Sequence, residues 1–355
     1  MSSHNSNDRF EGVEIKRVRH IQPLGFLSKS VRLNAPIDAF YGIIVSILYF
    51  MSIREKVDIV HTSGWSWNVF AASLWARING IPLVRELTSM RDQPMVQSKL
   101  KCFIRATLKW ADLIVAISPY LQIKCNEFGI GSKVWCRPNP ISVRKFFPLP
   151  LDEKNKLREA FFNGEISEKD ILILHVGRIR PLKNQLFSLK VLNLLPAKYH
   201  LAMVGPPYSL DDHYLASIKE YAEKASLKER VHIISENVDN VDEYMNAADI
   251  LVFPSTSEGL GTVMLEALMC GLPVVANFLP KITDWIIKDG VNGYTTSLDK
   301  KEFADKILKT ESLIAHRSEI ADMASKRFDS NAIDNEYIKR ISDLISNAQS
   351  KVKKV

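Results

Sequence analysis

The strongest constraint on the fold is an alternation of short apolar runs with longer amphipathic stretches along most of the 355 residues. Runs rich in valine, isoleucine and leucine are typical of strands covered on both faces, and helical patterns between them indicate βαβ units and parallel sheets. In the first half we predict strands at residues 13–18, 59–61, 82–85, 113–117 and 134–137. In the second half we predict strands at residues 171–176, 200–204, 231–235, 250–254 and 273–276.

A proline-rich segment separates the two sets of strands. Residues 138–150 (PNPISVRKFFPLP) contain four prolines and can continue neither a helix nor a central strand. A chain of 355 residues is too long for one ordinary core and suits two domains. We therefore predict a first domain over residues 1–150 and a second that begins at residue 151.

Charge is unevenly divided between the two halves. Residues 1–150 hold 20 Lys and Arg against 10 Asp and Glu, whereas the remainder holds 27 against 30. A basic half attracts phosphates or an anionic membrane, although a solvated face that keeps the protein soluble is the plainer interpretation. Because no aromatic and basic residues interleave and no recognition-helix pattern occurs, we expect no nucleic-acid partner.

Residues 39–51 (AFYGIIVSILYFM) form an apolar run that follows Pro36 and Asp38, a favourable start for a helix. Thirteen residues are short for a membrane span, so we expect a buried helix, with a helix lying on an anionic membrane surface as the alternative. The N-terminus lacks the apolar core of a signal peptide, and the four cysteines fall in no CxxC spacing. These features predict a cytoplasmic protein, with contact at the inner face of the membrane as a further option.

A glycine-containing loop leads from a predicted strand into a predicted helix within residues 249–276 (DILVFPSTSEGLGTVMLEALMCGLPVVA). Gly259 and Gly261 stand just before a helix that should begin near Thr262 and stop at Gly271. Glycine lets backbone N–H groups approach a ligand, and a helix N-terminus adds partial positive charge. The turn is therefore suited to a diphosphate, although many such turns use glycine for the turn alone.

Two acidic side chains flank these glycines. Glu258 precedes them in the loop, and Glu266 lies about one turn inside the predicted helix. One carboxylate near the reacting group and a second on ribose hydroxyls would suit a nucleotide-sugar site. The plainer interpretation of Glu266 is an acid that the helix dipole favours near the N-terminus.

Two basic residues follow another predicted strand, in residues 175–184 (HVGRIRPLKN). Gly177 makes the turn, and Arg178 and Lys183 lie at the carboxyl edge of the sheet, where such folds bind ligands. Two cations there would neutralise the charge that builds on a departing diphosphate, although basic loop residues are usually just solvated. Since the chain contains no Asp-x-Asp, we expect protein cations in this role and no metal ion.

Together these segments resemble the retaining glycosyltransferases of family 4, the group 1 transferases. The resemblance rests on GRIRPLKN, the glycine after LAMV, AADILVFPS, SEGLGTVMLEALMCGLPVVA, DGVNGY, DIVHTSG, ADLIVAIS and RPNPI, and covers roughly residues 55–345. It implies the GT-B architecture: two Rossmann-like parallel-sheet domains, 1–150 and 151–328, facing across a cleft, with residues 329–355 as a helix that crosses back. It also implies a first domain without its opening strand, loop, helix and strand, because residues 11–19 look like the family's third strand.

The resemblance implies roles for individual residues. Arg178, Lys183 and Glu258 would be catalytic, with both cations on the diphosphate and Glu258 at the donor sugar. The donor-binding residues would be Gly177, Asn184, Gly205, Glu236, Asn237, Gly259, Leu260, Gly261, Thr262 and Glu266. His61 and Glu86 are the acceptor-side candidates, and a buried structural role fits His61 equally well.

The implied activity transfers a hexosyl or related sugar from a UDP- or GDP-sugar to a glycan or lipid-linked acceptor, as in polysaccharide biosynthesis. The resemblance implies that configuration is retained through front-face attack, which needs no dedicated protein base if the leaving phosphate accepts the acceptor's proton. We expect neither a cofactor nor a metal ion. Two alternatives stay open: a non-catalytic partner subunit that binds nucleotide sugar or glycan, and a nucleotide-sugar epimerase. A nicotinamide dehydrogenase is not favoured, because no G-x-G-x-x-G follows a strand.

Overall fold

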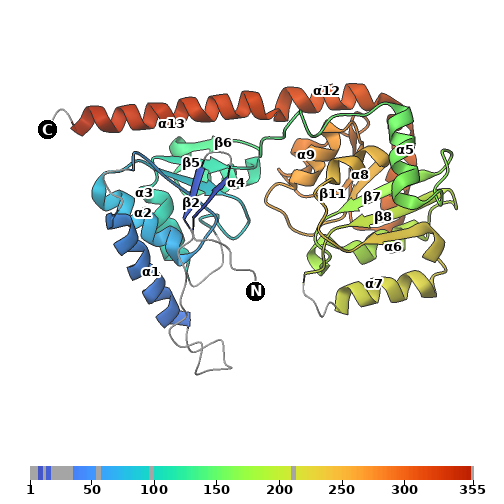
Figure 1. Ribbon diagram of the computed structural model, residues 1–355, viewed down its shortest axis with the longest axis horizontal. Coiled ribbons are helices and arrows are strands. Elements are labelled where there is room, and N and C mark those ends of the chain that lie inside the picture. The colour runs from blue at the N-terminus through green and yellow to red at the C-terminus, as the bar shows by residue number, and fades with distance from the viewer. Residues whose placement is uncertain are drawn as a thin grey trace.

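Two lobes lie side by side and share one long helix, as Figure 1 shows. The computed structural model describes residues 7–10, 13–16, 35–52, 57–95, 100–208 and 213–352. We call residues 35–140 the first lobe and residues 151–328 the second lobe. Each is built on its own parallel sheet, so the α/β prediction with two parallel-sheet units is confirmed. The exact limits of the domains stay a prediction.

The first lobe has a four-stranded sheet in the order β3-β4-β5-β6. These strands are β3 (Val60–Ser63), β4 (Leu83–Leu87), β5 (Leu113–Ala116) and β6 (Val134–Cys136). Its helices are α1 (Ala35–Ser52), α2 (Trp67–Asn79), α3 (Lys101–Trp110), α4 (Pro119–Glu127) and the 3₁₀ turn η2 (Gly131–Lys133). Helix α2 shows local control of its ends: Ser66 accepts from the Val69 N–H at its start, and Gly80 ends it.

The second lobe has a six-stranded parallel sheet in the order β12-β11-β10-β7-β8-β9. Its strands are β7 (Ile171–Val176), β8 (Tyr199–Val204), β9 (Val231–Ile234), β10 (Ile250–Phe253), β11 (Val274–Asn277) and β12 (Gly293–Thr296). Its helices are α5 (Leu151–Phe162), α6 (Gln185–Leu192), α7 (His213–Lys224), α8 (Val241–Ala247), α9 (Thr262–Met269), α10 (Thr283–Ile286), α11 (Lys300–Thr310) and α12 (Arg317–Phe328). Its 3₁₀ turns are η3 (Pro181–Lys183), η4 (Lys228–Arg230) and η5 (Glu311–His316). Strand order reverses between β7 and β10, which is where doubly wound sheets bind their ligands.

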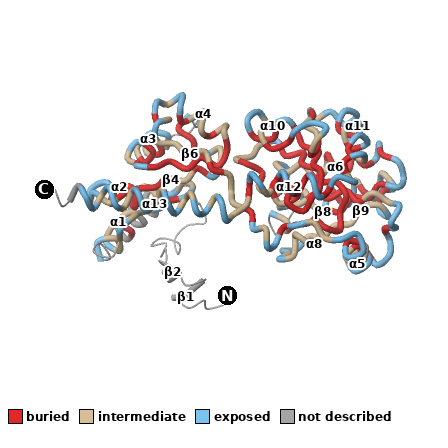
Figure 2. Tube along the Cα trace, turned by 90° about the horizontal axis from the view of Figure 1, so that it is seen from above, coloured by how far each residue is buried: buried red, intermediate tan, exposed pale blue. Residues whose placement is uncertain are grey.

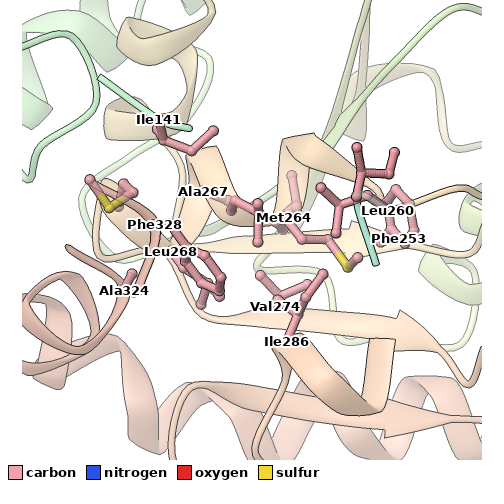
Figure 3. Packing of buried hydrophobic residues seen from close by; sticks show 14 of the residues in the cluster. Ile141, Phe253, Leu260, Met264, Ala267, Leu268, Val274, Ile286, Ala324 and Phe328 are labelled. Atoms are coloured by element: carbon pink, nitrogen blue, oxygen red, sulfur yellow. The ribbon is translucent and has the colours of Figure 1, made fainter. Parts of the chain in front are cut away.

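Helix α9 is fixed on the sheet by a dense apolar core (Figure 3), and Figure 2 shows that buried residues gather inside the second lobe. Met264 and Leu268 of this helix are fully buried, and they belong to one cluster with Phe253, Val274 and Phe328. Each fully buried side chain of this size contributes about 1.5 to 3 kcal/mol to folding. The core therefore holds the N-terminus of α9 at a set place on the edge of the sheet.

The two segments that join the lobes are bonded to one another. The Ile141 N–H donates to the Phe328 carbonyl at 2.9 Å, and the Ser330 N–H donates to the Ile141 carbonyl at 3.0 Å. Helix α13 (Ser330–Val352) then runs back along the first lobe, as Figure 1 shows. Its residues Tyr337, Ile341 and Leu344 pack against buried residues of the first sheet.

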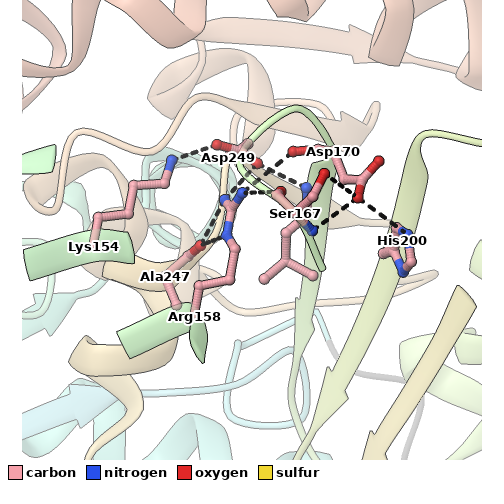
Figure 4. Close-up of polar contacts among 8 residues, drawn as sticks. Lys154, Arg158, Ser167, Asp170, His200, Ala247 and Asp249 are labelled. Atoms are coloured by element: carbon pink, nitrogen blue, oxygen red, sulfur yellow. Dashed lines mark hydrogen bonds and ion pairs between the residues drawn. The ribbon is translucent and has the colours of Figure 1, made fainter. Parts of the chain in front are cut away.

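A buried ionic network closes the opposite edge of the second sheet (Figure 4). Asp249 pairs with Lys154 and with Arg158 (2.8 Å), and it accepts the Leu172 N–H at 2.7 Å. Arg158 also donates to the Ala247 carbonyl at 2.9 Å. Burial lowers the pKa of Lys154 to about 8, with the Asp249 charge opposing that shift. The network ties α5 to the starts of two strands, on the side away from the strands' carboxyl ends.

Three sequence predictions need correction. Val13–Lys16 forms β2, but it pairs antiparallel with β1 (Asn7–Phe10) in a separate hairpin and not within the parallel sheet. Strand β12 was missed, because its sequence GYTT is short and begins with glycine. The helix predicted for residues 39–51 is present as α1, but it is not buried: Leu48 is 62% exposed and Met51 is 64% exposed. Its run is apolar on all sides, so only the neighbouring helix decides which face is covered.

Candidate active site

A cavity of about 480 Å³ opens between the lobes at the carboxyl ends of the second sheet's strands. Its second-lobe wall comes from the segments after β7, β8, β9 and β10, which include the point where strand order reverses. The residues of this wall are Val176, Gly177, Arg178, Lys183, Val204, Gly205, Pro206, Asn237, Val238, Val241, Glu258, Gly259, Leu260, Gly261, Thr262, Val263 and Glu266. A volume of this size is typical of small-molecule sites.

Lys183 and Glu258 meet inside the cavity although 75 positions separate them in the sequence. Lys183 ends the 3₁₀ turn η3 after β7, and Glu258 lies in the loop after β10. Their Nζ and Oε1 atoms are 2.6 Å apart, and both side chains are less than one-fifth exposed. Arg178 is exposed at the same wall. The cavity wall thus carries two cations, Arg178 and Lys183, and two acidic residues, Glu258 and Glu266.

The N-terminus of α9 forms the floor of the cavity. Gly261 precedes the helix in the left-handed conformation at φ 81°, which glycine adopts without strain. Thr262 is the first helical residue, as predicted, and it lines the cavity together with Gly261 and Val263. The first N–H groups of a helix have no partner further along the same helix. Such a helix end attracts anions.

Burial shifts the pKa of two groups near the floor. Desolvation raises the pKa of Glu266, and the charge of Lys145 opposes the shift. Desolvation lowers the pKa of His175 to about 3, and Lys183 adds to that effect. Since His175 is buried behind the wall and its Nδ1 lies 2.9 Å from the Ser188 hydroxyl, it is a neutral structural residue.

The first lobe contributes Thr88, Ile117 and Asn139 to the cavity, and sequence reasoning assigned a role to none of them. Asn139 donates its Nδ2–H to the Thr262 hydroxyl at 2.8 Å, across the gap between the lobes. It lies in the RPNPI segment that carried the family resemblance, which is the one signal that pointed to it. Asn139 therefore links the first lobe directly to the N-terminal turn of α9.

Gly259 is the point of closest approach between the lobes. A Cβ atom there would lie 2.6 Å from the Thr88 carbonyl oxygen, so a larger residue would push the lobes apart. The facing turn is held rigid by the buried Asp92, whose carboxylate accepts the Thr88 N–H (3.1 Å) and the Ser89 hydroxyl (3.0 Å). The cavity therefore depends on contact between two preformed turns.

Two predicted donor residues lie outside the cavity lining. Asn184 adopts φ 63° between η3 and α6, and its amide lies 3.4 Å from the Pro254 carbonyl, so it joins the two site loops. Glu236 is exposed after β9, next to Asn237, which does line the cavity. The other predicted donor residues and all three predicted catalytic residues are gathered in one hollow.

The two acceptor-side candidates lie beneath α13 and not in the cavity. His61 Nε2 is 3.3 Å from the Glu86 carboxylate, and His61 Nδ1 is 3.0 Å from the Tyr337 hydroxyl. Glu86 is also paired with Arg137 at 2.5 Å. Because side chains alternate across a strand, both point to the face that α13 covers. They connect the crossing helix to the first sheet.

Two family models match this chain over most of its length. The model of the group 1 glycosyl transferases matches residues 157–327, and that of glycosyltransferase family 4 matches residues 10–145. With the paired parallel sheets and the site loops described above, they establish that the chain belongs to the group 1 glycosyltransferases of the family 4 type. The resemblance seen in the sequence is thereby confirmed.

Curated relatives include enzymes of several specificities. The chain is 25% identical to N-acetyl-alpha-D-glucosaminyl L-malate synthase of Bacillus anthracis, over 80% of this chain and 74% of that protein. It is also 25% identical to UDP-Gal:alpha-D-GlcNAc-diphosphoundecaprenol alpha-1,3-galactosyltransferase of Escherichia coli, over 71% of this chain and 65% of that one. The names of these two relatives specify different sugars and different acceptors.

Solved structures establish the GT-B fold. Sucrose-phosphate synthase from Thermosynechococcus elongatus superposes with a TM-score of 0.78 at 17% identity, over 97% of this chain and 87% of that one. Anabaena Alr3699/HepE, solved in complex with UDP and glucose, superposes with a TM-score of 0.72 at 21% identity, over 83% and 80% of the two chains. The predicted architecture is therefore confirmed.

Proposed function

We propose that this glycosyltransferase moves a hexosyl or related sugar from a UDP- or GDP-sugar to a glycan or lipid-linked acceptor, with retention and without a metal ion. The observation that carries the proposal is the single hollow that holds Arg178, Lys183 and the N-terminus of α9. Relatives whose names specify a diphosphoundecaprenol acceptor support a lipid-linked acceptor, and Alr3699/HepE in complex with UDP and glucose supports a UDP-sugar.

In the proposed reaction Lys183 can pair with either of two anions, the Glu258 carboxylate or the diphosphate of the donor. Without ligand it pairs with Glu258, and an arriving diphosphate offers a stronger, doubly charged partner beside the α9 amides. The exchange places the lysine on the leaving group and frees the Glu258 carboxylate for a hydroxyl of the donor sugar. Cations and N–H dipoles then stabilise the charge that grows on the diphosphate in the transition state.

Retention requires no dedicated protein base. In the proposed front-face attack, the acceptor oxygen forms the new bond to the anomeric carbon as the bond to the diphosphate breaks. The proton of the acceptor hydroxyl passes to the departing phosphate oxygen. No metal is needed if Arg178, Lys183 and the helix dipole supply the positive charge, and the absence of Asp-x-Asp from the sequence supports this.

The proposal is tested first by binding and then by products. UDP-, GDP- and ADP-sugars are screened by thermal shift, where one donor at 100 times its Kd should stabilise the protein by about 2.7 kcal/mol. Transfer is then assayed with and without a lipid-linked acceptor in the presence of a chelator. Sugar conversion without acceptor would instead indicate an epimerase, and donor binding without any turnover would indicate a binding subunit.

A further inference from the structure

The outer face of α1 carries a stripe of exposed apolar side chains. Ile44, Leu48 and Met51 are 40%, 62% and 64% exposed, and their spacing of four and then three residues places them on one side of the helix. Ile78, in the last turn of α2, is 73% exposed. We call Ile44, Leu48, Met51 and Ile78 the apolar face.

This exposure follows from how the lobe packs. The other side of α1 rests on α2, where the Phe50 and Trp75 rings are 5.3 Å apart and the Ser46 hydroxyl donates to Asn68 Oδ1 at 3.3 Å. Helix α2 in turn packs on β3 and β4, so α1 forms the outer layer of the lobe (Figure 1). A helix anchored on one side presents its remaining apolar side chains outward.

The second lobe shows no comparable grouping among its described residues. Its exposed large apolar side chains lie on separate elements, such as Leu151 on α5, Leu308 on α11 and Met323 on α12. Scattered single residues of this kind are normal on a protein surface, whereas several on one helix face indicate an interaction site.

The net charge of the first half of the chain indicates which kind of partner covers this apolar face. Residues 1–150 carry ten more basic than acidic residues, and the exposed Arg77 stands next to Ile78. A segment with this net charge attracts anionic lipid headgroups, whereas a second copy of the same basic segment would be repelled. Within the described part of the chain, no helix is both long and apolar enough to cross a bilayer. An apolar stripe on a helix of this kind suits one that lies in the plane of the membrane interface.

We propose that α1 and the end of α2 dock the first lobe on an anionic bilayer, with the apolar face inserted among the lipids. The inference deepens the proposed function, since a lipid-linked acceptor is reached from the same surface. It makes the first lobe the membrane-facing part and leaves the second lobe free to take its donor from solution.

The test measures vesicle binding of the full chain without substrates, so it is independent of transferase activity. The chain should float with vesicles of phosphatidylcholine and phosphatidylglycerol, less so as salt rises, and much less with phosphatidylcholine alone. The double substitution Leu48→Glu and Met51→Glu should weaken binding at least about tenfold. The matched control, Leu151→Glu and Leu308→Glu in the second lobe, should bind as the unaltered chain does.

Each result bears on the proposal. All variants must keep the same melting transition and donor-induced thermal shift, which shows that the fold and the donor site are intact. Equal binding by the α1 variant and the unaltered chain, or no binding to anionic vesicles at all, would overturn the proposal. So would a dimer in light scattering that the α1 substitutions dissociate, because the face would then belong to a second copy. If no UDP-, GDP- or ADP-sugar raises the melting temperature of the unaltered chain, that result would instead count against the proposed function.

Discussion

The two lobes use their parallel sheets differently. The second sheet has six strands, its reversal point holds the cations of the site, and its opposite edge is closed by the buried Asp249 network. The first sheet has four strands among the described residues and is covered on one face by α13. The polar pair beneath α13 is more exposed than the Asp249 network: His61 is 36% and Glu86 13% exposed, whereas the Asp249 side chain is 7% exposed.

The two lobes therefore have different tasks: the second lobe holds the charged groups of the site, and the first lobe provides the parts that face them. Charged groups that must stabilise a transition state need fixed positions, and the buried core around α9 supplies them. The first lobe supplies a facing turn, Asn139 and an outward apolar helix. In the proposed function these parts serve the second substrate. The expected consequence is that substitutions in the second lobe remove stability and catalysis, while those in the first lobe shift them moderately.

The largest expected effect is on the stability of the second lobe. Asp249→Asn leaves Lys154 and Arg158 buried without their counter-charge, so it should lower the free energy of unfolding by about 3 kcal/mol or more. Denaturant titration measures this change. Asp152→Asn, at an exposed pair on α5, should change stability by less than about 0.5 kcal/mol. Equal effects of the two substitutions would refute the structural role of the network.

The second effect is on catalysis. Lys183→Ala removes a cation from the leaving group, so it should lower kcat by about 100-fold or more, roughly 3 kcal/mol of barrier, with little change in stability. Steady-state kinetics and a melting curve on the same preparation separate the two quantities. Lys156→Ala, an exposed lysine of the same lobe, serves as the control and should retain full turnover. Normal turnover of the Lys183 variant contradicts the assignment.

The third effect is on how the stability contribution of Glu86, in the first lobe, depends on pH. Burial acts to raise the pKa of Glu86, but the His61 hydrogen bond and the Arg137 charge outweigh it and hold that pKa below its ordinary value. A lowered carboxyl pKa stabilises the folded state above the unfolded pKa of about 4.3, and this contribution is lost as pH falls through the folded pKa. Glu86→Gln should therefore cost about 1 to 3 kcal/mol at pH 7 and progressively less below about pH 4.

Denaturant titrations of the two proteins across this pH range measure the difference. Glu127→Gln, at the exposed pair with Lys124, is the control, and it should hardly change the free energy of unfolding at pH 7 or below about pH 4. A cost for Glu86→Gln that is independent of pH would show that the pair between Glu86 and its partners does not hold α13 on the sheet.

The smallest expected effect is at the contact between the lobes. Asn139→Ala removes one hydrogen bond to Thr262, so it should weaken the apparent donor affinity by about 1 kcal/mol, roughly fivefold, and leave folding intact. The KM for the donor and the donor-induced thermal shift both report this change. Asn347→Ala, at an exposed position on α13, should leave both unchanged. If Asn139→Ala changes neither quantity, the hydrogen bond to Thr262 is not needed to position the N-terminal turn of α9.

Local patterns were enough to predict much of the second lobe. The apolar runs predicted β7 to β11 to within one or two residues, and the start of α9 at Thr262 followed from the glycines before it. Parallel strands place their carboxyl ends on one edge, so Arg178, Lys183, Glu258 and Glu266 could be assigned to one site from their positions shortly after predicted strands. Each of these inferences depends on interactions within a few residues.

Other features depended on contacts between distant segments and became visible only in three dimensions. The pairing of Lys183 with Glu258 joins two loops, and the approach of Thr88 to Gly259 joins two lobes. The sequence of α1 is apolar all round, so its composition could not say which face α2 would cover. Helix and strand propensity, apolar periodicity and helix capping act between neighbouring residues, so the sequence determines them. The exposure of a side chain and its contacts with distant residues depend on which surfaces meet, and only the tertiary structure decides that.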